Sequence, residues 1–169
     1  MADEALKSRT DAKLRYAKVH LDELKAQPTG RGHDFERAHQ EAFLAQLFGA
    51  YAALFQELNV DLRFCLPVES VALGKIRETL KSQGRTSPKL VELYRLENDP
   101  SSWLAQAKAM RDHISHVSGI PLVFYAGGTN DGLTSFRHPK SLAELPGDAI
   151  DVLASWLAEM EILVQRIRG

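Results

Sequence analysis

The chain has 169 residues, of which 44% are hydrophobic and 25% are charged, with a formal net charge of −1. These values predict one soluble globular domain that spans residues 1–169 and is large enough for a core. A net charge this close to zero excludes a general attraction to polyanions, so a nucleic-acid site would have to be a local basic patch.

No targeting or membrane segment is expected. Residues 1–10 carry four charged side chains and no apolar segment follows them, which differs from a signal peptide. The most apolar stretch, Ala42–Phe55, is too short to span a bilayer. We therefore expect a cytoplasmic protein with no membrane partner. The single cysteine, Cys65, cannot form an intrachain disulfide, and its neighbours Phe64 and Leu66 predict that it is buried.

Two long helices are predicted in the first third of the chain. The first covers about residues 3–26 and ends at Pro28 and the glycines that follow it. The second covers about residues 33–62 and has an unusually wide apolar face. That face consists of Phe43, Leu44, Leu47, Phe48, Tyr51, Leu54, Phe55, Leu58 and Leu62. A face this wide predicts a central helix that packs on more than one side.

Three shorter helices are predicted next. The third covers residues 68–82, after Pro67 has ended the second helix. The fourth starts at Ser87 and Pro88, a typical helix N-cap followed by proline in the first turn. The fifth starts after Asp99 and Pro100, and its apolar stripe is Trp103, Ala107, Met110, Ile114 and Val117.

The helical pattern is interrupted only at residues 118–146. Two short segments rich in β-forming residues, Ile120–Tyr125 and Leu133–Phe136, flank a glycine-rich run and predict a β-hairpin or an ordered flap, with a mobile surface loop as the open alternative. The last helix starts near Asp148, and its regular three-four spacing is typical of a bundle seam or a dimer contact. We therefore predict an all-α up-and-down bundle of five to six helices, with a small β-hairpin between the last two.

One short motif points to chemistry. Arg111 is followed by Asp112 and, after three more residues, by His116, at the end of the fifth predicted helix. A guanidinium stabilises charge that develops on a phosphate, and an imidazole transfers protons near neutral pH. The same spacing recurs at Arg15 and His20 without the polar residue after the arginine, and we interpret that pair as surface residues of the first helix.

Helix geometry limits how this motif would work. Five residues along one helix turn through about 140° net, so Arg111 and His116 do not face each other on a straight helix. They would meet only if the helix ended before His116, or if two copies of the segment converged across a symmetric homodimer. The open alternative is that Arg111 and Asp112 are solvated and His116 caps the C-terminus of the helix.

Residues of the connection between the last two helices are candidates to extend such a site. Arg137, His138 and Lys140 are candidate substrate-binding cations, and Phe124 or Tyr125 is a candidate for stacking on a base. A solvated loop is the alternative interpretation.

Some histidines are candidate metal ligands, with surface or hydrogen-bonded histidines as the alternative interpretation. His113 and His116 lie one turn apart, and Glu36 with His39 gives one Glu-x-x-His motif, to which Glu41 would add a carboxylate. A di-iron bundle needs two such motifs, and the chain has one. We therefore expect no metal and no cofactor.

The segment from Arg111 to His116, followed later by a long final helix, resembles the HEPN superfamily of helical-bundle domains. The resemblance implies that Arg111 and His116 are catalytic, that Asp112 orients them, and that the activity is metal-independent RNA cleavage. Many HEPN-like domains are non-catalytic. The chain as a whole is also similar to uncharacterised bacterial helical proteins, through Ser8-Arg9-Thr10 and Ser101-Ser102-Trp103-Leu104, and this similarity implies no known activity.

Two functions therefore stay open at this point. The first is a metal-independent ribonuclease that acts on RNA through Arg111, Asp112 and His116. The second is a non-catalytic homodimeric interaction module for an unidentified protein partner, with the last helix as the dimer contact.

Overall fold

Helices form most of the structure, a computed structural model that describes residues 2–26, 33–116, 119–126, 128–130 and 132–169. In chain order the elements are α1 (Ala2–Ala26), α2 (His33–Asp61), a 3-10 turn (Val68–Ser70), α3 (Leu73–Ser82), α4 (Pro88–Asn98), α5 (Trp103–His116), β1 (Leu122–Phe124), a second 3-10 turn (Gly128–Asn130), β2 (Thr134–Phe136) and α6 (Ala149–Arg168). The predicted all-α bundle with a hairpin before its last helix is confirmed.

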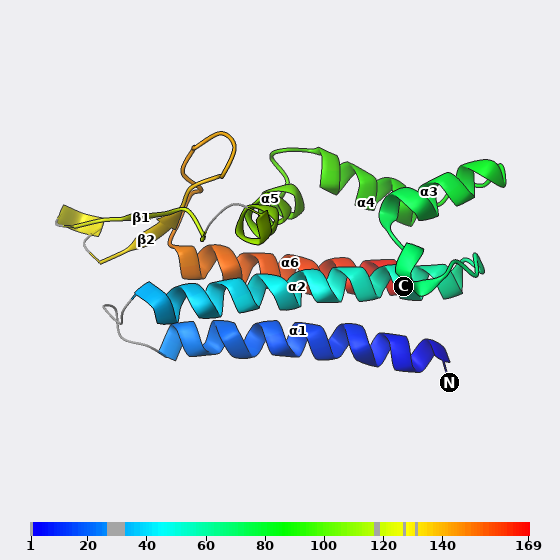
Figure 1. Ribbon diagram of the computed structural model, residues 1–169, viewed down its shortest axis with the longest axis horizontal. Helices are drawn as coiled ribbons and strands as arrows, with labels where there is room; N and C mark the ends of the chain where they lie inside the picture. Colours follow the sequence, from blue (N-terminus) through cyan, green and yellow to red (C-terminus); the bar gives the residue numbers. More distant parts are fainter. Residues whose placement is uncertain (1, 27–32, 117–118, 127, 131) are drawn as a thin grey trace.

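α2 is the central helix because apolar side chains cover most of its circumference. Its buried side chains include Phe43, Leu44, Leu47, Phe48, Tyr51, Leu54, Phe55 and Leu58. α1, α5 and α6 all pack on α2. Figure 1 shows α1, α2 and α6 side by side, with α2 and α6 running in one direction and α1 in the other. The wide apolar face therefore did indicate a helix that packs on several sides.

α6 uses its regular apolar stripe inside the chain. Its buried residues include Leu153, Leu157, Met160, Val164 and Ile167, and α6 packs on α1, α2 and α5. Of the two interpretations that the spacing allowed, the structure shows a bundle seam.

The β-hairpin is present and is tied to the start of α6. Its strands pair antiparallel, with Leu122 opposite Phe136, Val123 opposite Ser135 and Phe124 opposite Thr134. The Phe136 ring is buried and stacks on Trp156 of α6 at 5.9 Å between ring centroids. Asp148 caps α6 by accepting the Ile150 N–H at 3.0 Å and also accepts the Thr134 N–H at 3.1 Å. Residues 127 and 131 of the expected glycine-rich turn lie outside the described residues.

Two expectations between α2 and α3 were wrong. The third helix begins at Leu73, because extended backbone at Val71 and Ala72 separates it from the 3-10 turn at Val68–Ser70. Cys65 is exposed, not buried. Both Arg63 and Cys65 adopt a left-handed conformation with φ of 56°, which turns the chain at the end of α2 and points the thiol outward.

An ion-pair cluster joins both ends of the chain to α2. The Arg168 guanidinium donates to Glu57 Oε2 from Nε and to Glu57 Oε1 from Nη2, both at 2.9 Å, and to Asp11 Oδ1 from Nη1 at 2.7 Å. Thr10 Oγ1 also donates to Glu57, and the Lys7 carbonyl accepts from Arg168 Nη2 at 3.1 Å. Hydrogen bonding to Glu57 raises the pKa of Arg168 above its usual range. The Glu57 side chain is only 6% exposed, so its charge depends on this guanidinium.

Replacing Leu47 or Leu54 with alanine tests the central helix. Both side chains are fully buried, so each change should lower the free energy of unfolding by about 2 to 5 kcal/mol, measured by urea denaturation. Val19→Ala on the exposed face of α1 is the control, with an expected change within about 0.5 kcal/mol. A small effect of both leucine changes would contradict the central position of α2.

Replacing Arg168 with methionine tests the ion-pair cluster. It leaves the Glu57 carboxylate buried without its cation, so we expect a loss of roughly 3 to 5 kcal/mol in the free energy of unfolding. Arg166→Met is the matched control on the same helix, since Arg166 pairs with Glu92 at the surface and should contribute less than about 1 kcal/mol. Equal effects of the two changes would show that the buried cluster has no special role.

Candidate functional site

Arg111 and His116 lie at the end of α5 in different environments. The Arg111 guanidinium carbon lies 4.8 Å from the centroid of the Phe48 ring on α2, and its Nε lies 2.8 Å from Asp112 Oδ1. His116 is the last residue of α5 and is exposed. A cation over an aromatic face is held by the ring's electron density, so Arg111 is directed toward α2.

The chain does not bring Arg111 and His116 together. α5 stays helical through His116, so the two side chains remain about 140° apart around the helix axis. Within the described residues no hydrogen bond or ion pair joins them. Of the two arrangements that would let them meet, only convergence of two chains is compatible with this helix. Val117, expected in the apolar stripe of α5, lies outside the described residues.

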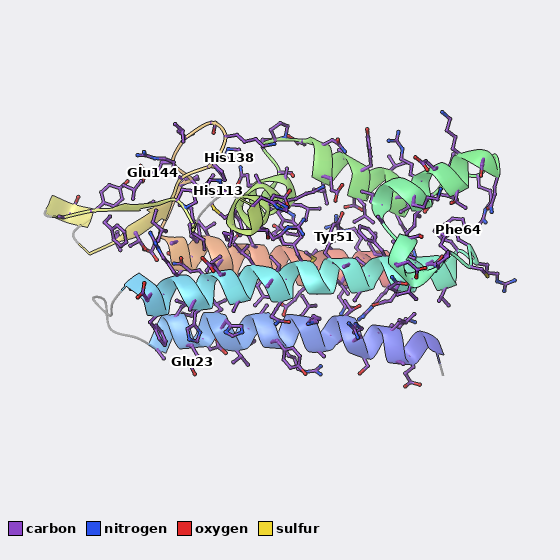
Figure 2. The ribbon with its side chains drawn as sticks, viewed as in Figure 1. Glu23, Tyr51, Phe64, His113, His138 and Glu144 are labelled. Carbon is purple, nitrogen blue, oxygen red and sulfur yellow. The ribbon has the colours of Figure 1, made fainter. Side chains whose placement is uncertain are left out.

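The three candidate substrate-binding residues follow β2. The backbone of Arg137 forms an isolated antiparallel β-bridge with the backbone of Glu144. The Lys140 side chain is exposed. His138 Nδ1 accepts the N–H groups of Lys140 at 3.3 Å and Ser141 at 3.2 Å. His138 therefore holds a local turn, and Figure 2 shows it at the same end of the molecule as His113. Phe124 is exposed on β1, while the Tyr125 hydroxyl donates to Glu144.

No metal cluster accompanies the motif. Among the residues that the structure describes, no group of three or more histidine, cysteine, aspartate or glutamate side chains is arranged to hold a metal ion. His39 instead contacts His20 on α1, with the two Nδ1 atoms 3.3 Å apart. His20 was predicted to be a surface residue of the first helix, and no contact with His39 was predicted.

A groove between α3 and α4 has a volume of about 830 Å³. Figure 1 shows α3 and α4 on the opposite side of α2 from α1. Its floor is apolar and includes Leu73, Leu80, Leu90, Val91 and Tyr94. Val91 is 65% exposed and Tyr94 is 40% exposed, so apolar surface stays open to solvent there. We call this surface the α3–α4 groove.

Three cations line the α3–α4 groove without a carboxylate partner. They are Arg77, Lys81 and Arg85. The Arg77 guanidinium carbon lies 3.7 Å from the centroid of the Tyr94 ring. Arg85 Nη1 donates to two neutral oxygens, the Leu62 carbonyl at 3.3 Å and Gln83 Oε1 at 3.0 Å. In the described part of the chain, none of the three forms an ion pair.

The two acidic residues that line the groove are already paired with other cations. Glu78 Oε2 lies 3.5 Å from Lys75 Nζ, and Glu97 Oε1 lies 3.2 Å from Lys108 Nζ of α5. Burial, with the charge of Glu97 as the next cause, raises the pKa of the Tyr51 hydroxyl above its usual range. Figure 2 shows Tyr51 on the side of α2 that carries α4 and α5. The groove therefore has an excess of positive charge.

A weak signal for this groove exists in the sequence. Residues 73–91 contain five basic side chains and one acidic side chain, whereas the whole chain has a net charge of −1. Arg77, Lys81 and Arg85 also follow one another at intervals of four residues. This spacing of basic residues differs from that of a catalytic motif and was not among the predicted site residues.

A smaller cavity of about 290 Å³ lies beside the ion-pair cluster. Its charged lining includes Lys7, Glu57, Asp61, Arg63 and Arg168. Because Arg168 already binds both Glu57 and Asp11, the charges there are used to hold the helices together, and the cavity is a weaker candidate than the groove.

Comparison with known proteins places the chain at the level of a family. A family model described as a family of unknown function (DUF6586) matches residues 1–169. The chain belongs to this family. The match carries no HEPN assignment and no activity. No curated protein and no solved structure matches the chain. In the described residues, no helix is both long enough and apolar enough to cross a membrane.

Proposed function

We propose that this member of the family is a non-catalytic interaction module that binds an acidic amphipathic helix of a partner protein in the α3–α4 groove. The observation that carries the proposal is the set of three cations, Arg77, Lys81 and Arg85, that face an apolar groove without carboxylate partners. Complementary charge selects and orients a partner, while burial of apolar surface supplies most of the affinity.

The shape of the groove favours a helix. Two neighbouring helices with an apolar floor form a surface into which a partner helix inserts side chains at positions i, i+3, i+4 and i+7. The exposed apolar side chains Val91 and Tyr94 would lose their contact with water on binding. The basic side chains Arg77, Lys81 and Arg85 would meet acidic residues on the flanks of the partner helix.

Several features favour a protein partner over RNA. Single-stranded RNA is bound mainly by aromatic rings that stack on its bases. Tyr94 is the aromatic residue that lines the groove, and the Arg77 guanidinium already covers its ring at 3.7 Å. The apolar leucine floor also suits leucine or phenylalanine side chains better than bases.

The first test is binding of a synthetic, fluorescently labelled amphipathic helix with glutamates on its polar face and leucines on the other. In fluorescence anisotropy the chain should bind this peptide, and should bind a matched peptide with lysines in place of glutamates at least about tenfold more weakly. The affinity for the acidic peptide should fall with added salt, because screening weakens the exposed charges.

Two triple variants that each remove three positive charges distinguish a role of the groove from a general effect of net charge. The triple change Arg77→Gln, Lys81→Gln and Arg85→Gln should weaken binding of the acidic peptide about tenfold or more. The control removes three exposed cations of α1, Arg9→Gln, Arg15→Gln and Lys25→Gln, and should leave binding nearly unchanged. Equal loss in the two triple variants, or equal affinity for the two peptides, would contradict the proposal.

A second candidate is metal-independent RNA cleavage by a HEPN-like site, supported by the Arg111-Asp112-His116 motif at the end of α5. In this proposal His116 transfers the proton, Arg111 binds the scissile phosphate, and Arg137, His138 and Lys140 bind flanking phosphates. Because α5 is helical through His116, the site requires a homodimer in which two α5 ends converge. His116 is exposed and would be accessible to a second chain.

Cleavage of single-stranded RNA in EDTA tests the second candidate. Wild-type protein should cleave a varied RNA pool, whereas His116→Ala and Arg111→Ala should abolish cleavage with little change in Tm. Sedimentation should also show a dimer at micromolar concentration. Wild-type cleavage no higher than that of His116→Ala, or a strictly monomeric protein, would eliminate this candidate and leave the interaction module.

A further inference from the structure

Two imidazoles face each other between α1 and α2. His20 of α1 and His39 of α2 have their Nδ1 atoms 3.3 Å apart, while their ring centroids are 5.3 Å apart and the rings are inclined by 67°. Because the nitrogens are much closer than the ring centres, the Nδ1 atoms point toward each other. Both side chains are partly exposed, so solvent and ions reach them.

The spacing of the two nitrogens fits a metal ion. Zinc binds imidazole nitrogen at about 2.0 to 2.1 Å, and a tetrahedral angle then places two such ligands about 3.3 to 3.4 Å apart. We propose that His20 and His39 form a two-imidazole site for a divalent transition metal of the Zn²⁺ type, which links α1 to α2. The proposal is independent of the α3–α4 groove.

The surroundings of His20 keep the pair ready to bind. Burial, followed by the charge of His39, lowers the pKa of His20 from its usual value, and the charge of Glu23 opposes this shift. A lowered pKa favours the neutral imidazole, and only a neutral nitrogen binds a metal. Glu23 lies one turn further along α1 than His20 and adds negative charge beside the site. Figure 2 shows Glu23 near the C-terminal end of α1.

Packing also fixes the second ligand. The Phe35 ring lies 4.3 Å from the His39 ring, centroid to centroid, with an angle of 36° between them. This contact limits rotation of His39, so less conformational freedom is lost when a metal binds. The two histidines would be the protein ligands, and water would complete the coordination. Such a site exchanges its metal more readily than a closed four-ligand site.

The geometry alone also fits a hydrogen bond between one protonated and one unprotonated Nδ1. The two interpretations differ in what Zn²⁺ does. A hydrogen-bonded pair gains nothing from the ion, whereas a two-imidazole site binds it and holds α1 against α2. Metal that binds only the folded state raises the Tm, and above the Kd the rise grows with the logarithm of the metal concentration.

Titration of the untagged protein with Zn²⁺ alone, by calorimetry at neutral pH, tests the proposal. Wild-type protein should bind one ion per chain, and His20→Ala and His39→Ala should each weaken binding at least about tenfold. Val19→Ala is the matched control, an exposed side chain next to His20 on α1 that should leave the affinity unchanged.

A second measurement, of thermal unfolding, keeps the test decisive if an alanine variant loses stability. Zn²⁺ should raise the Tm of the wild-type protein and of Val19→Ala, but not that of the double variant His20→Gln and His39→Gln, which keeps polar side chains at both positions. Binding by the wild-type protein no tighter than binding by the double variant, or an equal Tm shift in both, would overturn the proposal and leave a hydrogen-bonded histidine pair.

Discussion

The structure depends on the burial of α2. An apolar face that includes Phe43, Leu47 and Leu54 cannot be covered by one neighbour, so α1, α5 and α6 all pack against it. Three long helices then lie side by side, and the ion pairs of Arg168 with Glu57 and with Asp11 join the last helix to the first two. α3 and α4 lie to one side of this layer (Figure 1), and residues of both helices line the α3–α4 groove.

Much of this fold could be predicted from the sequence because its helices are long and strongly periodic. Strand-forming residues on both sides of a glycine-rich run also predicted the hairpin, which the Phe136–Trp156 contact holds on α6. The errors occurred at residues 63–72, where hydrophobic spacing carries little information. The left-handed backbone at Arg63 and Cys65 determines the exposure of the thiol, and neither residue type requires that conformation.

The candidate site was harder to predict for a different reason. The motif at Arg111 and His116 lies within one segment of the sequence. The α3–α4 groove instead depends on how two helices pack and on which residue pairs with each charged side chain. Glu97 is neutralised by Lys108, a contact between α4 and α5 that no local pattern shows. The approach of Arg77 to Tyr94 likewise depends on how α3 packs on α4. For the same reason, the sequence could not pair His20 with His39.

We propose that ligand binding occurs on α3 and α4 rather than at the end of α5. Amide chemical-shift mapping by NMR, during titration with the acidic amphipathic peptide, locates the binding surface residue by residue. We expect the shifts to concentrate in residues 73–98. Shifts concentrated at the end of α5 and in the hairpin, or none at saturating peptide, would contradict it.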